Sequence, residues 1–418
     1  MAVSLPNIHP RVIIIGASFA GLKAALTLPR QFAVTVIDKS PWFEFLPNIH
    51  ELVSGIKTPH MLQFSNAALV RRAGHRYLYD TVTEILPEKN QVITRHGKSL
   101  YYDFCIIAAG SATNTYGVPG ADQYALQFKS VAQCHAIGRR LSDLSKNPGE
   151  FFINIVGAGL EGVEALGEIL RRYRKHKGLR VRIIENQARI LNDAPADIES
   201  VIKKHCRPYE IEFFTGESVK QVSASGITLS SGEALRSDAT IWTGGIQPPA
   251  FLNSSGFSKT SRQWPSVNEC LQHQTHENVF LAGDAAGLPN ALPKQAYHAI
   301  DMGVSAAQNL IQLHAGRPLA PFRPAAKPTI IAFGDLDTFV IIGKTVVAGA
   351  ALGALKEAVF QVVMNDFDPS ALPGKALHLS SRAWLSGRQI ALNFLHSPLA
   401  LLRLGKIRVL RQSVTKMN

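Results

Sequence analysis

The chain has 418 residues, 46% of them hydrophobic and 18% charged, and its formal net charge is +13. This length and composition are typical of a folded protein with two or three domains, and they exclude a disordered chain. The first residues lack the basic and apolar regions of a secretory signal, and no uncharged apolar run reaches the roughly 18 residues of a membrane-spanning helix. We therefore expect a cytoplasmic protein that is soluble or peripheral to a membrane.

A glycine-rich turn stands close to the start of the chain. The apolar run Val12–Ile15 predicts a buried parallel strand, and Gly16, Ser18 and Gly21 follow it with the spacing of a dinucleotide-binding turn. Serine stands where the pattern has its middle glycine, and its hydroxyl could donate to a phosphate oxygen. The helix that begins on this turn would direct unpaired backbone N–H groups at a pyrophosphate.

An acid follows this first turn at the expected interval. Asp38 ends the next predicted strand, about 20 residues on, where a carboxylate accepts from an adenosine ribose hydroxyl. An aromatic loop, Pro41–Gly55, then runs into a short helix. Consecutive strands follow and end on the small residues Ala108–Ser111, and Ser130–Leu144 reads as a helix.

A second, complete turn repeats the pattern in the middle of the chain. Gly157, Gly159 and Gly162 follow a second apolar run, and Glu185 stands where Asp38 stands in the first unit. We expect this acid to favour NADH, because a carboxylate would repel the 2′-phosphate of NADPH. Arg189, four residues on, could partly offset that repulsion.

Two later strands also end in small or polar residues. Gly244 and Gly245 close the strand that begins at Asp238, and Gly283–Asp284 closes the strand Val279–Ala282. An aspartate at the carboxyl end of a buried strand lies where ligands bind in open α/β sheets, although it could merely cap the following turn. Pro293 fits the first position of the next helix, whose positive end would face whatever Asp284 binds.

The last 44 residues, Lys375 to Asn418, contain eight lysines and arginines and no acid. Leucines, Trp384 and Phe394 alternate with these cations, which is typical of a segment lying on an anionic membrane surface. Ordinary packing helices with extended arginines remain an alternative. No recognition motif accompanies the charge, so we expect no nucleic-acid partner. Upstream, Leu336–Pro369 predicts strands followed by a helix.

As a set, these segments resemble the two-dinucleotide-binding flavoprotein oxidoreductases, and more narrowly their type II NADH dehydrogenase and apoptosis-inducing-factor-like branch. The resemblance covers about Arg11 to Leu310 and rests on the ordered segments GASFAG, VIDK, FLPNIHELVSG, FCIIAAGS, IVGAGLEGVEALGE, IWTGGIQP and VFLAGDAAG. It implies an α/β fold with two Rossmann-like domains in a glutathione-reductase-like arrangement, plus a smaller C-terminal α+β domain. The implied boundaries are 1–115 and 273–325 for FAD, 116–272 for NAD(P)H and 326–418 for the C-terminal domain with its basic apolar tail.

The same resemblance implies which residues bind the cofactors. The FAD site would comprise Gly16, Ser18, Ala20, Gly21, Asp38, Lys39, Pro47, Val82, Ala109, Gly110, Gly283, Asp284 and Ala296. The NAD site would comprise Gly157, Gly159, Gly162, Glu185, Gly244 and Gly245. Within the first set, Asp284 would bind the ribityl chain of the flavin. No metal site is expected, because the four cysteines, Cys105, Cys134, Cys206 and Cys270, have neither zinc-ligand nor redox spacing.

Three residues are implied as catalytic: Glu164, Lys294 and Gln295. In the family, the acid matching Glu164 lies near flavin and nicotinamide, where it could position the nicotinamide or manage protons. Alternatively, Glu164 only complements the dipole of the first helical turn. Glu168, one turn later, is expected to be solvated or salt-bridged. The segment PKQAYHA, which contains Lys294 and Gln295, is similar to that of mitochondrion-associated quinone reductases, whereas the glutamines of the type II helix are missing.

The sequence thus predicts an FAD-dependent oxidoreductase that transfers hydride from NADH to flavin and two electrons to a quinone. We expect it at the cytoplasmic face of a membrane, and a homodimer is compatible with the sequence. One alternative is a soluble NAD(P)H-dependent reductase of a small electron-transfer protein such as a rubredoxin or ferredoxin. Another is a flavin-binding signalling protein with slow turnover, similar to apoptosis-inducing factor.

Overall fold

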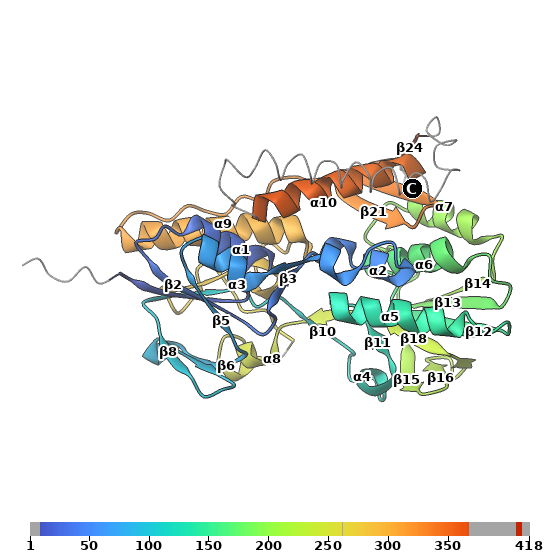
Figure 1. The fold of residues 1–418 in the computed structure, drawn as a ribbon, viewed down its shortest axis with the longest axis horizontal. Helices are drawn as coiled ribbons and strands as arrows, with labels where there is room; N and C mark the ends of the chain where they lie inside the picture. Colours follow the sequence, from blue (N-terminus) through green and yellow to red (C-terminus); the bar gives the residue numbers. More distant parts are fainter. Residues whose placement is uncertain (1–8, 261, 368–406, 412–418) are drawn as a thin grey trace, which may run out of the picture.

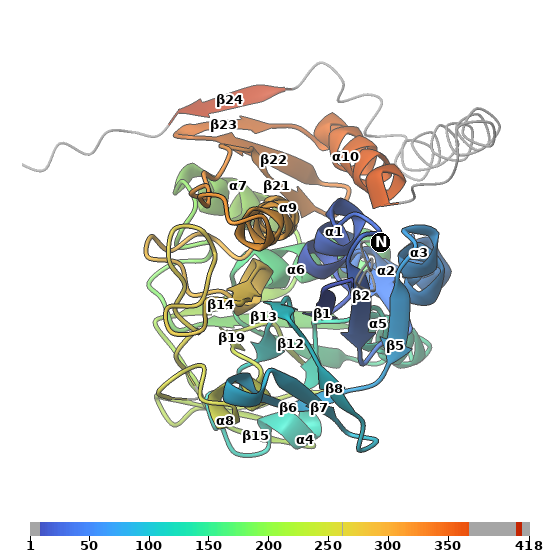
Figure 2. The same cartoon turned by 90° about the vertical axis from the view of Figure 1, so that its left-hand side faces the viewer.

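A computed structural model describes residues 9–260, 262–367 and 407–411. Two parallel sheets form the two lobes of the molecule, and an antiparallel sheet with a long helix lies across them (Figure 1). This is the α/β architecture with two Rossmann-like units that the sequence predicts. Figure 2 shows the antiparallel sheet beside its helix at the top of the molecule.

The first sheet has the strand order β20-β9-β1-β2-β5, all parallel. Its strands are β1 (Arg11–Ile15), β2 (Ala33–Asp38), β5 (Arg76–Tyr79), β9 (Phe104–Ile107) and β20 (Val279–Leu281). Branched aliphatic side chains fill its interior because helices cover both faces; Ile14 and Val36 are fully buried. The accompanying helices are α1 (Phe19–Thr27), α3 (Asn66–Arg72) and α9 (Ala296–His314).

Smaller elements decorate this lobe. They are the pair β3 (Trp42–Glu44) and β4 (Gln63–Ser65), the short helices α2 (Glu51–Ser54) and α8 (Ala250–Ser254), and the meander β6 (Val82–Leu86), β7 (Gln91–Thr94) and β8 (Ser99–Tyr101). Helices α1 and α9 pack closely because Gly303 lacks a side chain. A Cβ there would stand 2.2 Å from the carbonyl oxygen of Ala20.

The second sheet repeats the design with the order β11-β18-β12-β13-β14. Its strands are β11 (Leu126–Gln127), β12 (Phe151–Val156), β13 (Leu179–Glu185), β14 (Ile211–Thr215) and β18 (Ala239–Trp242). Its longer helices are α5 (Val131–Leu144), α6 (Leu160–Tyr173) and α7 (Asp197–Cys206). Helix α4 (Ala121–Tyr124) and the sheet β15 (Val219–Ser223), β16 (Gly226–Leu229) and β17 (Ala234–Arg236) extend this lobe, and β10 (Ala112–Thr113) pairs with β19 (Ile246–Gln247) where the chain crosses between the lobes.

The C-terminal unit consists of an antiparallel sheet and α10 (Gly353–Phe367). Its strands are β21 (Thr329–Phe333), β22 (Asp337–Ile342), β23 (Thr345–Ala348) and β24 (Arg408–Arg411). The unit sits tightly on α6, because Gly167 faces Gly334 with no room for a Cβ between them. Phe360 and Phe367 of α10 pack edge-on or tilted against the aromatic loop that follows β2.

Two expectations are corrected here. Helix α9 begins at Ala296, not at Pro293, because Gln295 is extended with φ −130° and ψ 147°. Part of the basic tail belongs to the fold: Arg408 lies in β24 and forms an ion pair with the buried carboxylate of Asp337. The remainder of the predicted membrane segment, 375–406 and 412–418, lies outside the described residues. Among the helices in the described ranges, none combines the length and apolarity needed to cross a bilayer.

Candidate cofactor sites and a buried polar cluster

Both glycine-rich turns lie where neighbouring connections leave their sheet in opposite directions. The first turn follows β1 and stands beside the end of β9. Gly16 adopts φ +104°, and a Cβ there would stand 2.2 Å from the carbonyl oxygen of Ala108. A Cβ at Gly21 would stand 1.8 Å from the carbonyl oxygen of Gly16. Only glycine therefore allows the strand, turn and helix to pack here, at the position where open α/β sheets bind nucleotides.

The second turn repeats this geometry between β12 and β18. Gly157 adopts φ +99° and stands against the backbone of Gly244, while a Cβ at Gly162 would approach the carbonyl oxygen of Gly157 to 2.0 Å. Gly159 differs, because a Cβ built there meets nothing within 4 Å. The middle glycine thus leaves open space in front of the N-terminus of α6, as close approach of a pyrophosphate would require.

The acid that follows each turn accepts a hydrogen bond from the same backbone position of that turn. Asp38 accepts from the backbone N–H of Ala17 at 2.5 Å, and Glu185 accepts from that of Ala158 at 2.6 Å. Each carboxylate therefore stands at the mouth of its turn, as a ribose-binding acid must. Burial raises the pKa of Asp38, although the N–H groups of Ala17 and Ser40 oppose that shift.

The position of Arg189 in the sequence suggests that it could bind a 2′-phosphate, but its guanidinium makes other contacts. Its guanidinium donates to the carbonyl oxygens of Leu191, Asn192 and Ala194, at 3.1 Å for Leu191 and 2.7 Å for Ala194. These bonds hold the loop after β13 closed. The guanidinium is thus engaged with backbone, which reduces its capacity to accommodate a 2′-phosphate beside Glu185.

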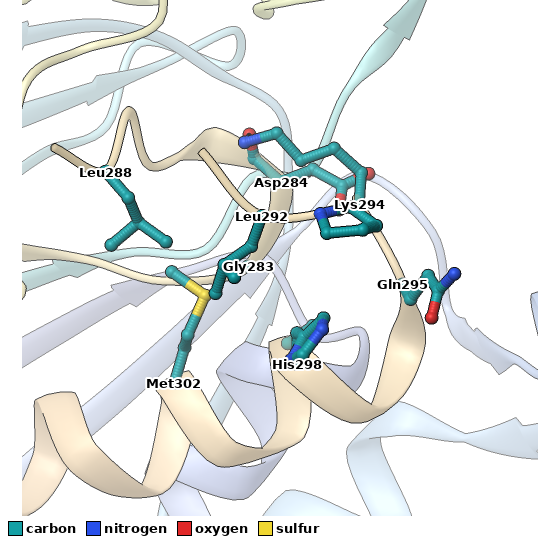
Figure 3. Close-up of a pocket in the computed structure, with 10 residues that line it drawn as sticks. Gly283, Asp284, Leu288, Leu292, Lys294, Gln295, His298 and Met302 are labelled. Atoms are coloured by element: carbon teal, nitrogen blue, oxygen red, sulfur yellow. Dashed lines mark hydrogen bonds between the residues drawn. The ribbon is translucent and has the colours of Figure 1, made fainter. Parts of the chain in front are cut away.

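A small pocket lies at the carboxyl end of β20, lined by Gly283, Asp284, Lys294, Gln295 and His298 among others (Figure 3). Asp284 accepts from the hydroxyl of Ser111 at 2.9 Å, across from the end of β9. Lys294 donates to the carbonyl oxygens of Asp284 and Ala286, both at 2.8 Å. The predicted residues of the flavin side, 283–284 and 294–296, are thus together at the start of α9.

Lys294 is held in place from two sides. Besides its carbonyl contacts, its ammonium lies 4.3 Å from the ring centroid of Trp264. Burial lowers its pKa, while Asp284 opposes that shift. Nearby, the buried Oε1 of Gln295 has no hydrogen-bond partner within the described part of the chain. A free acceptor in the lining of a pocket fits a ligand that carries N–H groups.

The other residues predicted for the flavin occupy flanking positions. Ala20 is buried in α1 beneath Gly303, Ala109 and Gly110 follow β9, and Val82 begins β6. Ser18 caps α1 without a side-chain hydrogen bond of its own to the helix. Lys39 is exposed just beyond β2, and Pro47 lies in a single 3-10 turn over Leu46–Asn48.

Glu164 does not occupy the helix position expected for it. Helix α6 begins at Leu160, so Glu161 is the first-turn acid and Glu164 opens the second turn. Glu164 is buried, pairs with Lys356 of α10, and accepts from the backbone N–H of Ala332 at 3.1 Å. The alternative that it only complements the helix dipole is therefore wrong. Burial raises its pKa, and Lys356 opposes that shift.

His50 completes this buried contact. Its Nδ1 lies 3.5 Å from Glu164 Oε2, and its Nε2 lies 3.4 Å from the ammonium of Lys356. Burial and the neighbouring Lys356 hold its pKa well below the usual value. The imidazole is therefore neutral, and one ring nitrogen can donate while the other accepts.

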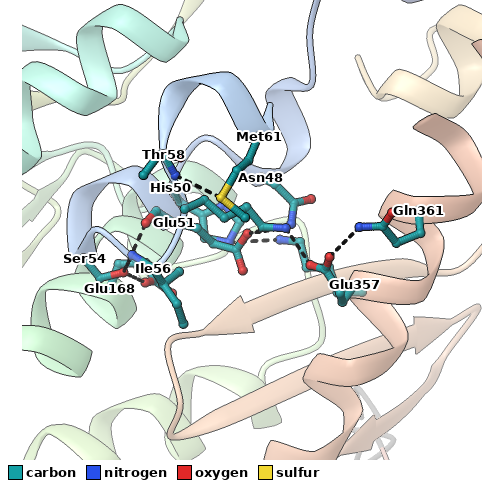
Figure 4. Close-up of polar contacts among 12 residues, drawn as sticks. Asn48, His50, Glu51, Ser54, Ile56, Thr58, Met61, Glu168, Glu357 and Gln361 are labelled. Carbon is teal, nitrogen blue, oxygen red and sulfur yellow. Dashed lines mark hydrogen bonds and ion pairs between the residues drawn. The ribbon is translucent and has the colours of Figure 1, made fainter. Parts of the chain in front are cut away.

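A second group of buried charges continues the cluster (Figure 4). Lys57 lies 2.6 Å from Glu357 of α10 and 3.5 Å from Glu51, and Asn48 donates to Glu51 at 2.9 Å. Burial raises the pKa of Glu357 against the effect of Lys57. These side chains come from the segment around α2 and from α10, so the cluster ties the first lobe to the C-terminal unit.

Glu168 is salt-bridged, which is one of the two outcomes that the sequence predicts for it. It pairs with Arg171, at 3.3 Å, so the salt bridge is found, but it is fully buried and not solvated. Ser54 donates to its carboxylate. Burial raises its pKa to about 7. The sequence did not indicate the roles of Lys356, Lys57 and Glu357, because these residues belong to no recognisable motif.

All four cysteines are free thiols. Within the part of the chain that the structure describes, no three His, Cys, Asp or Glu side chains are grouped so that they could bind a metal ion. Three of the four cysteines are buried. Burial raises the pKa of Cys105 and Cys134, and that of Cys206 to about 12. These thiols are protonated at neutral pH and unsuited to thiolate chemistry.

Two equivalent nucleotide turns at the switch points of two parallel sheets define an α/β protein built to bind two dinucleotides. The family model of the pyridine nucleotide-disulphide oxidoreductases matches residues 10–303. The chain belongs to this family, which implies FAD and NAD(P)H as its cofactors. The open space at Gly159, the acids Asp38 and Glu185 and the free acceptor of Gln295 fit these cofactors.

Several known proteins are similar along most of the chain. The type II NADH:quinone oxidoreductase of Staphylococcus haemolyticus is 21% identical over 379 residues, covering 84% of this chain and 94% of that one. The alternative NAD(P)H-ubiquinone oxidoreductase C1 of Arabidopsis thaliana is 26% identical over 381 residues, covering 80% and 73%. The structure of NDH2 from Plasmodium falciparum in complex with NADH superposes with a TM-score of 0.80 at 16% identity, covering 93% of this chain and 98% of that one.

Proposed function

We propose that this protein is an FAD-dependent NADH:quinone oxidoreductase that acts at a membrane surface. The observation that carries the proposal is the pair of turns bound by an acid, Asp38 on Ala17 and Glu185 on Ala158, at the switch points of the two parallel sheets. Two such sites in one chain serve two dinucleotides. The named activity of its relatives supports a quinone as the acceptor.

The residues divide into two binding sets. Gly157, Gly159, Gly162 and Glu185, with Gly244 and Gly245 behind them, would bind NADH, with the pyrophosphate at the start of α6. The first turn with Asp38, together with Gly283, Asp284 and the start of α9, would bind FAD. When bound, FAD accepts hydride from the nicotinamide and passes two electrons to the acceptor.

Lys294 and the amino end of α9 supply positive potential at the flavin side. Lys294 is fixed by two carbonyl oxygens and by Trp264, so it needs no rearrangement to face a ligand. The positive end of a helix adds to the effect of its ammonium. We assign both to the stabilisation of negative charge at the pyrimidine end of the ring.

Reduction of a quinone also consumes two protons, and the buried cluster offers groups that could supply them. Glu164 has a raised pKa and touches neutral His50 and cationic Lys356. A carboxyl group whose pKa is raised by burial holds its proton more readily than an exposed one, which suits it to proton transfer. We assign Glu164 as the proton-handling residue, with His50 and Lys356 as its positioning partners.

The basic tail supports a location at a membrane. Between Lys375 and Asn418 it combines eight cations with Trp384 and Phe394, and a hydrophobic quinone resides in the bilayer. Docking on the membrane would bring the enzyme to that substrate, and among the described residues no helix is long and apolar enough to cross a bilayer. Arg408 is excluded from this role, because it pairs with buried Asp337.

The test is an assay panel on the purified protein. We expect a yellow protein with noncovalently bound FAD that oxidises NADH with a water-soluble quinone in repeated turnovers. Activity that depends on an added ferredoxin or rubredoxin would identify a soluble carrier reductase instead. Bound FAD with negligible turnover on every acceptor would point to a signalling role and contradict the proposal.

A further inference from the structure

An ion pair stands on the second nucleotide turn at a position that the dinucleotide motif does not specify. Glu161 lies between Gly159 and Gly162, in the first turn of α6, and both its carboxylate oxygens accept from the ammonium of Lys129, at 2.6 and 2.7 Å. Lys129 precedes α5, which belongs to the same lobe. The pair is thus part of the mouth of the NADH site.

The pair also lies beside the flavin side of the molecule. Burial raises the pKa of Glu161, Lys129 opposes that shift, and the negative charge of Asp284 adds a smaller increase. The neighbouring Val131 donates its backbone N–H at 3.0 Å to Glu44, which belongs to the first lobe. The Lys129–Glu161 pair therefore stands next to a contact between the two lobes, on the side of the second lobe that faces the flavin-binding lobe.

The pair is held firmly but is not closed off. The backbone N–H of Lys129 donates to Gln133 Oε1 at 3.0 Å. The backbone N–H of Gln133 donates in turn to the hydroxyl oxygen of Ser130, the N-cap residue of α5, at 3.2 Å. The Lys129 side chain is 25% exposed and that of Glu161 is 33% exposed. A fixed ammonium and a fixed carboxylate thus face accessible space side by side.

We propose that the Lys129–Glu161 pair binds the carboxamide of the nicotinamide ring and so positions the ring for hydride transfer. A primary carboxamide presents one acceptor, its carbonyl oxygen, next to one donor group, its NH₂. The pair presents the complementary pattern, with Lys129 as donor and Glu161 as acceptor. This inference rests on the proposed function, because it assigns a ligand group within the proposed NADH site.

A competing role for Lys129 is to bind the pyrophosphate. The local charges disfavour it, because Glu161 neutralises Lys129 and would itself repel a phosphate. The glycine turn and the N–H groups of α6 already serve an anion there. The two roles differ in whether binding of ADP-ribose, which contains the pyrophosphate but no nicotinamide, depends on Lys129.

The test compares NADH with reduced 3-acetylpyridine adenine dinucleotide, in which a methyl group replaces the carboxamide NH₂ while the carbonyl stays. For Glu161→Ala we expect kcat/KM with NADH to fall about tenfold to a hundredfold, and with the analogue far less, because only NADH loses a charge-assisted hydrogen bond. For Lys129→Met we expect kcat/KM to fall by a similar factor with both substrates. Glu161→Gln keeps an acceptor oxygen and should change the ratio least.

Controls separate this role from a structural one. Glu212→Gln removes the partner of Arg182 on the edge strand β14, two strands from the glycine turn, and should leave the ratio of kcat/KM for NADH over the analogue unchanged. Flavin content and ADP-ribose affinity, measured by calorimetry, should match wild type in all variants. An unaltered substrate ratio in Glu161→Ala, or weaker ADP-ribose binding in Lys129→Met, would overturn the inference. Wild-type protein that neither binds NAD⁺ nor oxidises NADH would instead overturn the proposed function.

Discussion

Lys356 of α10 donates to the carboxylate of Glu164 on α6, and this buried pair joins the C-terminal unit to the helix of the second nucleotide turn. We expect Lys356→Met to destabilise the protein by about 3–5 kcal/mol, because it leaves a buried carboxylate without its cation. Urea unfolding measures this change. Adding Glu164→Gln should recover part of the loss.

A matched control for that pair is Lys327→Met. Lys327 pairs with Asp301 at 2.6 Å, but both side chains are about one-third exposed. Removing an exposed pair should cost less than about 1 kcal/mol. Equal losses for the Lys356 and Lys327 variants would contradict the view that burial gives the Glu164 contact its importance.

Glu168 makes stability depend on pH. Its pKa is raised from 4.5 to about 7 by burial, so between these values the folded state binds more protons than the unfolded chain. The free energy of unfolding therefore falls as pH rises from 4.5 to 7, by up to about 3 kcal/mol from this one group. Glu168→Gln should remove that slope. Unfolding curves at several pH values, with parallel slopes for the variant and wild type, would refute the assignment.

Glycines within the two turns should respond differently to alanine. Gly21→Ala should lower FAD occupancy and stability together, because its Cβ would collide with the carbonyl oxygen of Gly16. Gly159→Ala should fold normally, since its Cβ meets no protein atom within 4 Å, yet bind NADH more weakly by about tenfold or more. Flavin absorbance, melting temperature and NAD⁺ titration separate the two effects. Full flavin occupancy in Gly21→Ala would count against the first site.

Glu185 should decide the choice of nucleotide. We expect wild type to prefer NADH, and Glu185→Ala to reduce the ratio of kcat/KM for NADH over NADPH by about tenfold. Arg189 should contribute little to NADPH binding, because its guanidinium is bound to the carbonyl oxygens of its own loop. Wild-type protein that prefers NADPH would contradict this prediction.

The basic tail should carry membrane binding. Reversal of Arg403, Lys406 and Arg411 to glutamate should abolish binding to anionic liposomes at low salt, while FAD content and NADH oxidation with a water-soluble quinone stay near wild type. Arg408 is left unchanged because its ion pair with Asp337 stabilises the C-terminal sheet. Co-sedimentation with vesicles measures the effect. Wild-type protein that remains in the supernatant would exclude docking.

Local patterns were sufficient for most of the fold. The strands before Gly16 and Gly157, the helix over Val131–Leu144 and the strands and helix after Leu336 agree with the prediction, because each is specified by neighbouring residues. The start of α9 differed, since the chain from Pro293 to Gln295 stays extended while Lys294 binds the carbonyls of Asp284 and Ala286.

The sequence by itself determined the two nucleotide units, because strand, glycine turn, helix and acid fall within one run of roughly 30 residues whose geometry is local. Only the tertiary structure decided which acidic side chains are buried away from solvent. The sequence left Glu168 either solvated or salt-bridged, and the fold buries it against Ser54 of α2. Glu164 meets Lys356, which is 192 positions away in the chain. Desolvation depends on elements packed from distant parts of the chain, and no local pattern records it.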